Sequence, residues 1–244
     1  MSRVAQIWRH PIKGIGAEPL ERAALTPDRP MPGDRAWALL TGAAEDTGGW
    51  QKCNLFARGC NGPQLMAITA RSEGEVVHLS HPTAGAITIN PAQDGQKLVA
   101  WLSPLWPQER PALGRLIQAP EEGMSDAPYA CLSILGTASL AALSEACGAP
   151  LDPRRFRGNL WIEGLQPFEE LDWPGRQLKI GDTVLEVSER IDRCRATETN
   201  PDTGERDINT LQVLRKTWGH IDFGVKARVV TGGTIALGQK AELL

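Results

Sequence analysis

The sequence has 244 residues, 41% of them hydrophobic, and a formal net charge of −3. A chain of this length can bury a sizeable core as one large domain or two modest ones. Its near-neutral charge balance gives no electrostatic reason to expect nucleic acid or an acidic membrane surface as a partner. No apolar run approaches the roughly 20 residues that cross a bilayer, and the first residues do not resemble a secretion signal. We therefore expect a cytoplasmic protein with no membrane partner.

Five cysteines are spread widely along the chain, at Cys53, Cys60, Cys131, Cys147 and Cys194. An odd number in a chain of this size does not indicate a disulfide framework. No Cys-x-x-Cys pair or Cys/His cluster indicates a zinc site or an iron–sulfur cluster, so a redox centre would have to be brought in from outside. Cys131 and Cys147 lie in apolar segments and are expected to be buried and inert.

Short strands are predicted throughout the first half. Alternation of apolar and polar residues predicts strands at 4–8, 36–40, 76–79 and 86–89, of which the last two form a hairpin. Several prolines between 91 and 122 argue against long regular elements there. We place a module boundary near residue 120.

The second half contains the two predicted helices, over 137–147 and 209–218. Each has apolar residues at three-to-four spacing and is followed by a glycine that can end it. Strands are predicted within 177–187, which turns at Gly181-Asp182, and within 225–243. Many short strands and few helices indicate a mostly β protein of the α+β class.

The most informative stretch for chemistry surrounds Cys194. It lies among Arg190, Arg193 and Arg195 and is followed by the turn Asn200-Pro201-Asp202-Thr203-Gly204. Cationic neighbours favour the thiolate, the form of cysteine that attacks electrophiles and binds soft metals. In an extended segment the two adjacent arginines would point away from the cysteine, so only a bent loop brings them to it. An ordinary strand cysteine is the alternative.

This arrangement resembles the signature of the MOSC domain, named after the C-terminal domain of molybdenum-cofactor sulfurases. The blocks that carry the resemblance are the cysteine stretch, Arg155-Phe156-Arg157-Gly158-Asn159-Leu160, Gly233-Thr234-Ile235-Ala236-Leu237-Gly238, and an N-terminal stretch with Pro11-Ile12-Lys13 and Gly33-Asp34-Arg35. The N-terminal stretch is similar to the β-barrel module that precedes MOSC in many of these proteins. The resemblance implies an N-terminal β-barrel-like module over 1–120 and a MOSC β-barrel with a few peripheral helices over 121–244.

The resemblance also implies a site. MOSC proteins of the mitochondrial amidoxime-reducing type, like bacterial reductases of N-hydroxylated compounds, bind a molybdopterin cofactor whose molybdenum is held by one protein cysteine. Cys194 takes the place of that cysteine, as metal ligand and catalytic residue. Contacts to the cofactor are implied for Lys13, Arg35, Arg157, Asn159 and Arg193. From the residues alone, Arg35 could instead pair with a nearby carboxylate. We expect loss of Arg157 to lower cofactor occupancy more than loss of Arg58.

The implied activity is a molybdenum-dependent, pyridoxal-phosphate-independent oxidoreductase that reduces an N-hydroxylated small molecule. Its electrons would come from a separate ferredoxin-, cytochrome- or flavin-type donor protein, because the chain lacks the cysteines of a fused ferredoxin domain. Two alternatives stay open: a non-enzymatic carrier of the molybdenum cofactor, or a sulfur carrier in which Cys194 holds a persulfide. Bound metal with turnover, bound metal without turnover, and cyanide-labile sulfur on Cys194 distinguish the three.

Overall fold

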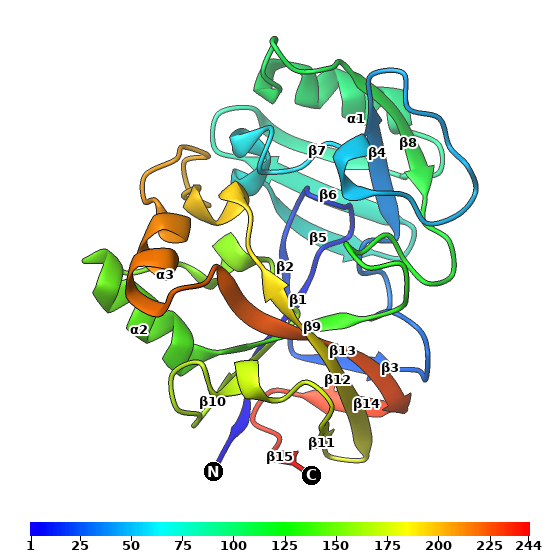
Figure 1. The fold of residues 1–244 in the computed structure, drawn as a ribbon. Coiled ribbons are helices and arrows are strands. Elements are labelled where there is room, and N and C mark those ends of the chain that lie inside the picture. The colour runs from blue at the N-terminus through cyan, green and yellow to red at the C-terminus, as the bar shows by residue number, and fades with distance from the viewer.

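The computed structural model describes all 244 residues, and a curved sheet of eight strands forms its larger part (Figure 1). The strands are β1 (Arg3–Arg9), β2 (Glu18–Leu20), β9 (Leu132–Gly136), β10 (Leu160–Glu163), β11 (Gln177–Ile180), β12 (Thr183–Asp192), β13 (Asp222–Thr231) and β15 (Ala241–Leu243). Their order in the sheet is β15-β11-β12-β13-β9-β10-β1-β2. Only β9 and β10 run parallel. The predicted strands at 4–8 and 177–187 belong to this sheet, as do β13 and β15 of the predicted stretch 225–243.

The sheet curls until its first strand meets the end of the chain. The Val4 N–H donates to the Gln239 carbonyl at 2.9 Å, and the Val4 carbonyl accepts from the Gly238 N–H at 2.8 Å. Strand β14 (Gly233–Ala236) leaves the sheet to pair with β3 (Arg22–Leu25). The two termini consequently lie close together (Figure 1).

Both predicted helices are confirmed, as α2 (Thr137–Cys147) and α3 (Thr210–Trp218). Each is followed by a glycine in the left-handed region, Gly148 at φ 70° and Gly219 at φ 79°, where other residues are strained. They bury leucines against an aromatic cluster that contains Phe156, Trp161 and Phe223. With 11 residues in α2, the longest helix, none is long and apolar enough to cross a membrane.

A smaller unit lies above the large sheet and has its own core (Figure 1). Its strands are β4 (Trp37–Thr41), β5 (Thr69–Glu73), β6 (Val76–His81), β7 (Gly85–Ile89) and β8 (Leu113–Gln118). β5, β6 and β7 form an antiparallel meander that confirms the predicted hairpin, and β4 pairs with β8. Short 3-10 helices connect elements at Cys53–Leu55, Pro63–Ala67, Ser103–Leu105, Pro153–Phe156, Glu169–Asp172 and Arg195–Glu198.

The proline-rich stretch between 91 and 122 is more regular than expected. It holds α1 (Gly95–Leu102), which buries Leu98 and Leu102, and strand β8. The prolines flank these elements instead of interrupting them, so the backbone hydrogen bonds of the helix and the strand are intact.

The first strands of the chain are placed in the second half's sheet. β1 pairs with β10, and β3 pairs with β14, although more than 130 residues separate the partners in each pair. The start of the chain thus serves both units, since Ile12 and Ile15, between β1 and β2, belong to the core of the smaller one. The sequence boundary near residue 120 stays a prediction.

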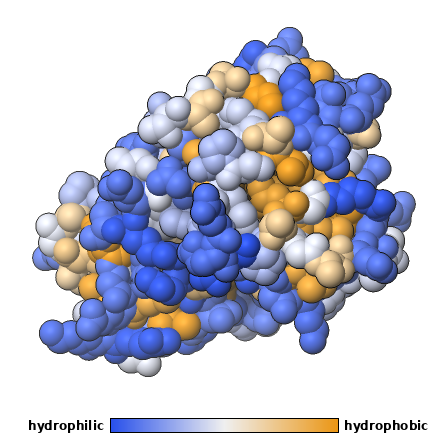
Figure 2. All heavy atoms as spheres, turned by 90° about the horizontal axis from the view of Figure 1, so that it is seen from above, coloured by the Kyte–Doolittle hydropathy of each residue, from blue (hydrophilic) through white to orange (hydrophobic).

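Hydrophilic side chains cover most of the face in Figure 2, which looks down on the end that carries α1 and β8, and the largest hydrophobic area lies right of its centre, with smaller ones elsewhere. In the whole molecule the exposed large hydrophobic residues are Met1, Val230, Leu237 and Leu244. Nearly all large apolar side chains are therefore used in the cores.

A buried carboxyl group fixes the start of α2. The Glu170 side chain is fully buried and accepts hydrogen bonds from the Gly136 N–H at 3.1 Å and the Ser139 hydroxyl at 2.8 Å. These contacts satisfy a donor at the helix N-terminus that has no partner within the helix. Burial raises the pKa of Glu170 above its usual value, against the hydrogen bonds that lower it.

We expect Glu170→Ala to lower the free energy of unfolding by about 2 kcal/mol, because a buried donor is left without its acceptor. The folded-state pKa lies above the unfolded one, so wild-type stability falls as pH rises from about 4.5 toward the folded pKa. Glu170→Gln cannot ionise and should not share that loss. Urea unfolding at several pH values checks both expectations, and a constant gap between wild type and Glu170→Gln would contradict the second.

Candidate functional site

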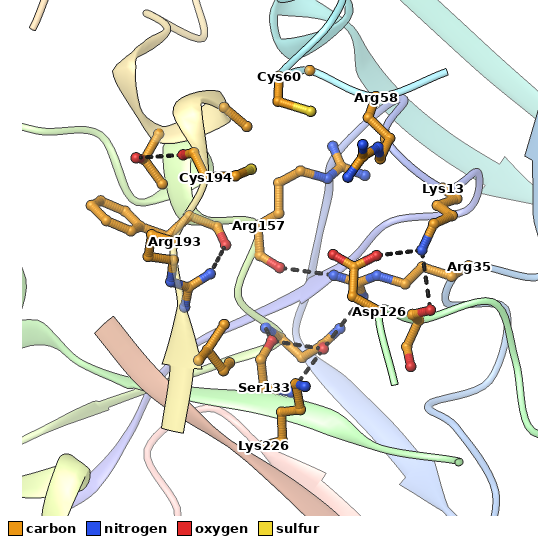
Figure 3. Close-up of a pocket in the computed structure, with 18 of the residues that line it drawn as sticks. Lys13, Arg35, Arg58, Cys60, Asp126, Ser133, Arg157, Arg193, Cys194 and Lys226 are labelled. Atoms are coloured by element: carbon orange, nitrogen blue, oxygen red, sulfur yellow. Dashed lines mark hydrogen bonds and ion pairs between the residues drawn. The ribbon is translucent and has the colours of Figure 1, made fainter. Parts of the chain in front are cut away.

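A pocket lies between the large sheet and the smaller unit (Figure 3). It has a volume of about 150 Å³. Among the segments that line it are those that follow β1, β12 and the 3-10 helix Pro153–Phe156. The segments that precede β4 and β9 line it as well. All six residues assigned from the sequence line it: Lys13, Arg35, Arg157, Asn159, Arg193 and Cys194. The structure thus brings together residues from opposite ends of the chain, while their roles stay predictions.

Basic side chains dominate the pocket. Seven line it against two acidic ones, and the basic residues are Lys13, Arg35, Arg58, Arg155, Arg157, Arg193 and Lys226. Four of these form ion pairs: Lys13 with Asp126, Arg35 with Asp34, Arg155 with Asp207 and Lys226 with Glu189. Arg58, Arg157 and Arg193 have no carboxylate partner. The remaining positive charge favours an anionic ligand.

Arg157 is the most exceptional of these cations. Its backbone lies in the left-handed region, at φ 49°, where non-glycine residues are strained. Its guanidinium donates only to backbone carbonyls, of Gly16 at 3.0 Å and Ile12 at 3.4 Å. Burial, with repulsion from Arg35, lowers the pKa of Arg157 to about 9. A buried cation without a counter-charge is destabilising, and such groups concentrate at binding sites.

Arg35 and Lys13 already have anionic partners. Arg35 pairs with Asp34, as the alternative interpretation of this residue allowed, and also donates to the Arg157 carbonyl at 3.1 Å. The Lys13 ammonium donates to the carbonyls of Met124 at 2.8 Å and Ser125 at 3.1 Å and to the Asp126 carboxylate. An anion that reaches Lys13 has to displace Asp126.

Asp126 belongs to the loop that covers this side of the pocket (Figure 3). Its side chain is 66% exposed although it is paired. Desolvation by the surrounding pocket atoms raises the pKa of this mostly exposed carboxyl, but attraction to Lys13 and Arg35 outweighs this and leaves the pKa below the usual value. The carboxylate is therefore charged at neutral pH and blocks Lys13.

Arg193 and Asn159 form the wall of the pocket through saturated contacts. The Arg193 guanidinium donates to the carbonyls of Phe156 at 2.9 Å and Phe223 at 2.7 Å, and it lies 5.7 Å from the centre of the Phe156 ring. The Asn159 side chain accepts from the N–H and hydroxyl of Ser133, both at 3.0 Å. The protein's own carbonyls and hydroxyls thus hold both side chains in place, so each is suited to shaping the pocket.

Cys194 is exposed on the side of the pocket opposite Lys13 and Asp126 (Figure 3). Interaction with the Cys60 thiol, which also lines the pocket, is the largest influence that lowers the pKa of Cys194, to about 6. The Ala196 N–H and Arg58 act in the same direction, against burial and Asp126. The pKa of Cys60 is raised correspondingly, so Cys60 keeps its proton while Cys194 loses its own.

The prediction that the neighbouring arginines stabilise the Cys194 thiolate was wrong in its main part. Arg193 turns to backbone carbonyls, and Arg195 is 62% exposed and pairs with Glu198 at 2.8 Å. Arg190 donates to the Leu171 carbonyl at 2.7 Å. Cys194 itself is extended, at φ −109° and ψ 174°, so its sequence neighbours point elsewhere. Its strongest stabilising contacts come from the distant turn that carries Arg58 and Cys60.

The sequence analysis missed this turn, Gly59-Cys60-Asn61-Gly62, and treated Arg58 as lying outside the site. Arg58 donates from Nη1 to the Cys53 sulfur at 3.0 Å, and its Nε is buried without a partner. Gly59 approaches the side chain of Met66 so closely that a Cβ would collide with it. The available signal of a tightly packed turn was the pair Gly59 and Gly62, which lie on either side of Cys60 shortly after Arg58.

Two family models match the chain. The MOSC domain matches residues 121–242, and the MOSC N-terminal beta barrel domain matches residues 1–104. The chain belongs to the MOSC family. A human relative, mitochondrial amidoxime-reducing component 1, is 25% identical over 99% of this chain and 82% of its own length.

Other MOSC relatives are molybdenum cofactor sulfurases. That of Caenorhabditis elegans is 26% identical over 92% of this chain, and that of Anopheles gambiae is 40% identical over 29% of it. This MOSC chain spans only 33% of the former protein and 9% of the latter. Among solved structures, the YUAD protein from Bacillus subtilis is 12% identical, with a TM-score of 0.48 over all of this chain and 96% of that one.

Alkylation of Cys194 in the cofactor-free protein should be half-maximal in rate near pH 6, because the thiolate is the reactive form. Cys60→Ala should move the midpoint upward, toward the ordinary thiol value of about 8.5. Quenched iodoacetamide labelling followed by mass spectrometry measures the rate at Cys194 separately from the other cysteines.

Cys147→Ala is the matched control for this experiment, since Cys147 lies on α2 and does not line the pocket. It should leave the midpoint where it is in the wild type. If Cys60→Ala also leaves the midpoint unchanged, the cause assigned here to the acidity of Cys194 is wrong.

Proposed function

We propose that this protein is a molybdenum-cofactor-binding reductase of N-hydroxylated small molecules. The observation that carries the proposal is an exposed cysteine, Cys194, whose pKa is about 6 in a pocket with an excess of basic side chains. The names of its MOSC relatives, an amidoxime-reducing component and several molybdenum cofactor sulfurases, support a function connected with this cofactor.

The residues present fit an anionic cofactor that carries a metal. The Arg58 Nε is buried without a partner, and the half-buried Arg157 has no carboxylate partner. An anionic group between them would compensate both charges. A cysteine thiolate is the soft, anionic ligand that suits a metal in such a site. Cys194 would hold the metal, and Arg157 and Arg58 would contact the anionic part.

When bound, this cofactor supplies a molybdenum centre that exchanges two electrons with the substrate. The net change at the substrate is the conversion of N–OH to N–H and water, which takes up two electrons and two protons. The chain's own contribution is to keep Cys194 deprotonated and to hold the guanidinium groups in place through the carbonyls of Gly16, Phe156 and Phe223. Positioning of this kind lowers the reorganisation needed when the cofactor binds.

The remaining parts of the proposal concern partners and location. The electrons come from a separate ferredoxin-, cytochrome- or flavin-type protein, and the protein works in the cytoplasm. Lys13, which is saturated by the 124–126 loop, joins the cofactor contacts only when Asp126 gives way.

A sulfur carrier is the second candidate. The observation that favours it is the match to the Caenorhabditis elegans molybdenum cofactor sulfurase across 92% of this chain. An exposed thiolate such as Cys194 is also suited to hold a persulfide. In that case purified protein should carry cyanide-labile sulfur on Cys194 and should not turn over N-hydroxylated substrates.

The proposal is tested by the molybdenum and pterin content of protein purified from a host that makes the cofactor. Wild type should carry close to one molybdenum per chain, and Cys194→Ala should lose it, because the metal ligand is gone. Arg157→Ala should lower pterin content severalfold. Arg71→Ala is the control, since Arg71 is 67% exposed on β5 and does not line the pocket.

Turnover is then measured with an amidoxime as the substrate and a reduced viologen dye as the electron donor, which replaces the unknown partner. Loaded wild type should form the amidine, and Cys194→Ala should not. Wild type that contains neither molybdenum nor pterin would overturn the proposal. Molybdenum without turnover would favour a carrier.

A further inference from the structure

Two loops from opposite halves of the chain meet beside Cys194. The Arg206 guanidinium donates to the Cys60 carbonyl at 2.7 Å, and the Gln64 amide donates to the Gly204 carbonyl at 3.2 Å. A Cβ built on Gly59 would lie 3.5 Å from the Ala196 Cβ, which is ordinary van der Waals contact. The backbone beside Cys60 is therefore fixed against the loop that carries Cys194.

The side chains of Cys60 and Cys194 line the same pocket. Both lie at the same end of it (Figure 3), and the Cys60 thiol donates to the Asn61 Oδ1 at 3.6 Å. Cys194 is exposed and Cys60 is half-buried, so small oxidants reach the first of them directly. In the proposed reductase chemistry Cys194 is the metal ligand, and Cys60 acts only through its effect on the pKa of Cys194.

We propose that Cys60 and Cys194 are a redox-active pair that forms a reversible disulfide when the cofactor-free protein meets a peroxide. The oxidised protein then lacks the free thiolate at Cys194 that a metal would need. The disulfide would also join the smaller unit covalently to the loop after β12. The state of this pair thereby decides whether the pocket can accept a cofactor.

The chemistry balances in two steps. The Cys194 thiolate attacks one oxygen of the peroxide, the O–O bond breaks, and a sulfenic acid forms as hydroxide (or alkoxide) leaves. The Cys60 sulfur then attacks the sulfenic sulfur, the S–O bond breaks, and water leaves with the Cys60 proton. The thiol pair loses two electrons, which the peroxide gains. A dithiol reductant reverses the reaction by thiol–disulfide exchange.

The other cysteines are engaged differently. Cys131 also lines the pocket, but it is buried and its sulfur lies 3.5 Å from the Ser125 hydroxyl. The Cys53 sulfur accepts a hydrogen bond from Arg58, and Cys147 lies on α2 outside the pocket. The pairing should therefore be specific to Cys60 and Cys194.

The experiment uses the full-length, cofactor-free protein with hydrogen peroxide at about one equivalent, followed by alkylation and peptide mapping without reduction. Cleavage after Arg58 separates Cys60 from Cys53, and fragmentation of the peptide that holds both Cys131 and Cys147 separates links to those two residues. We expect loss of two of the five free thiols, a single link between Cys60 and Cys194, and full reversal by dithiothreitol. Fewer than about one molecule in ten cross-linked would overturn the proposal.

Two variants sharpen the result. Cys60→Ser should give no disulfide and leave Cys194 as a sulfenic or sulfinic acid, whereas Cys147→Ser should behave as wild type. A link from Cys194 to Cys131 or Cys53 would contradict the assigned pair. The wild-type result needs no variant to fold and no cofactor to bind, so failure of the proposed reductase function would leave this test unaffected.

Discussion

The pocket depends on the hydrogen bonds of one buried side chain, that of Asn159. Its Nδ2 donates to the Trp8 carbonyl at 3.1 Å, and its Oδ1 accepts from both donors of Ser133. Its main chain pairs with the same two residues, so β1, β9 and β10 are held in one register. Arg35 reaches Asn159 at 3.5 Å and the neighbouring Arg157 carbonyl at 3.1 Å. A neutral amide with contacts to three segments thus holds in place the backbone around the charged groups.

The charged groups are arranged so that some are compensated and some are not. Asp34, Asp126 and Asp207 neutralise three of the cations, which keeps the fold stable with several buried guanidinium groups. Arg157 donates to carbonyl oxygens and Arg58 to a sulfur, and neither has a carboxylate partner. Since an isolated buried charge is destabilising, this imbalance is best understood as preparation for a ligand of opposite charge. The strained backbone at Arg35 and Arg157, both at φ 49°, lies at the same place.

The sequence predicted the strands and helices well because their periodicity and their terminal glycines are local properties. α2 and α3 end where Gly148 and Gly219 require it. The family motif also identified Cys194 and five of its pocket neighbours. Contacts between distant segments could not be foreseen in the same way. Cys60 has no pattern that points to Cys194, and the carboxylate that Lys13 meets is more than 110 residues away. The prediction from the arginines next to Cys194 was wrong for the same reason. In an extended chain, the side chains of adjacent residues point to opposite faces.

The position of β1 has a consequence for how the protein is made. Residues Arg3–Arg9 leave the ribosome well before their partner β10, which begins at Leu160, and the Val4 N–H finds its acceptor only at Gln239. The unit formed by β4 to β8 is complete long before that and can pack while translation continues. The apolar residues of β1 stay exposed until nearly the whole chain has been synthesised. Pairing over such sequence distances is slow. The nascent chain is therefore the stage at which this protein is most exposed to aggregation and to chaperones.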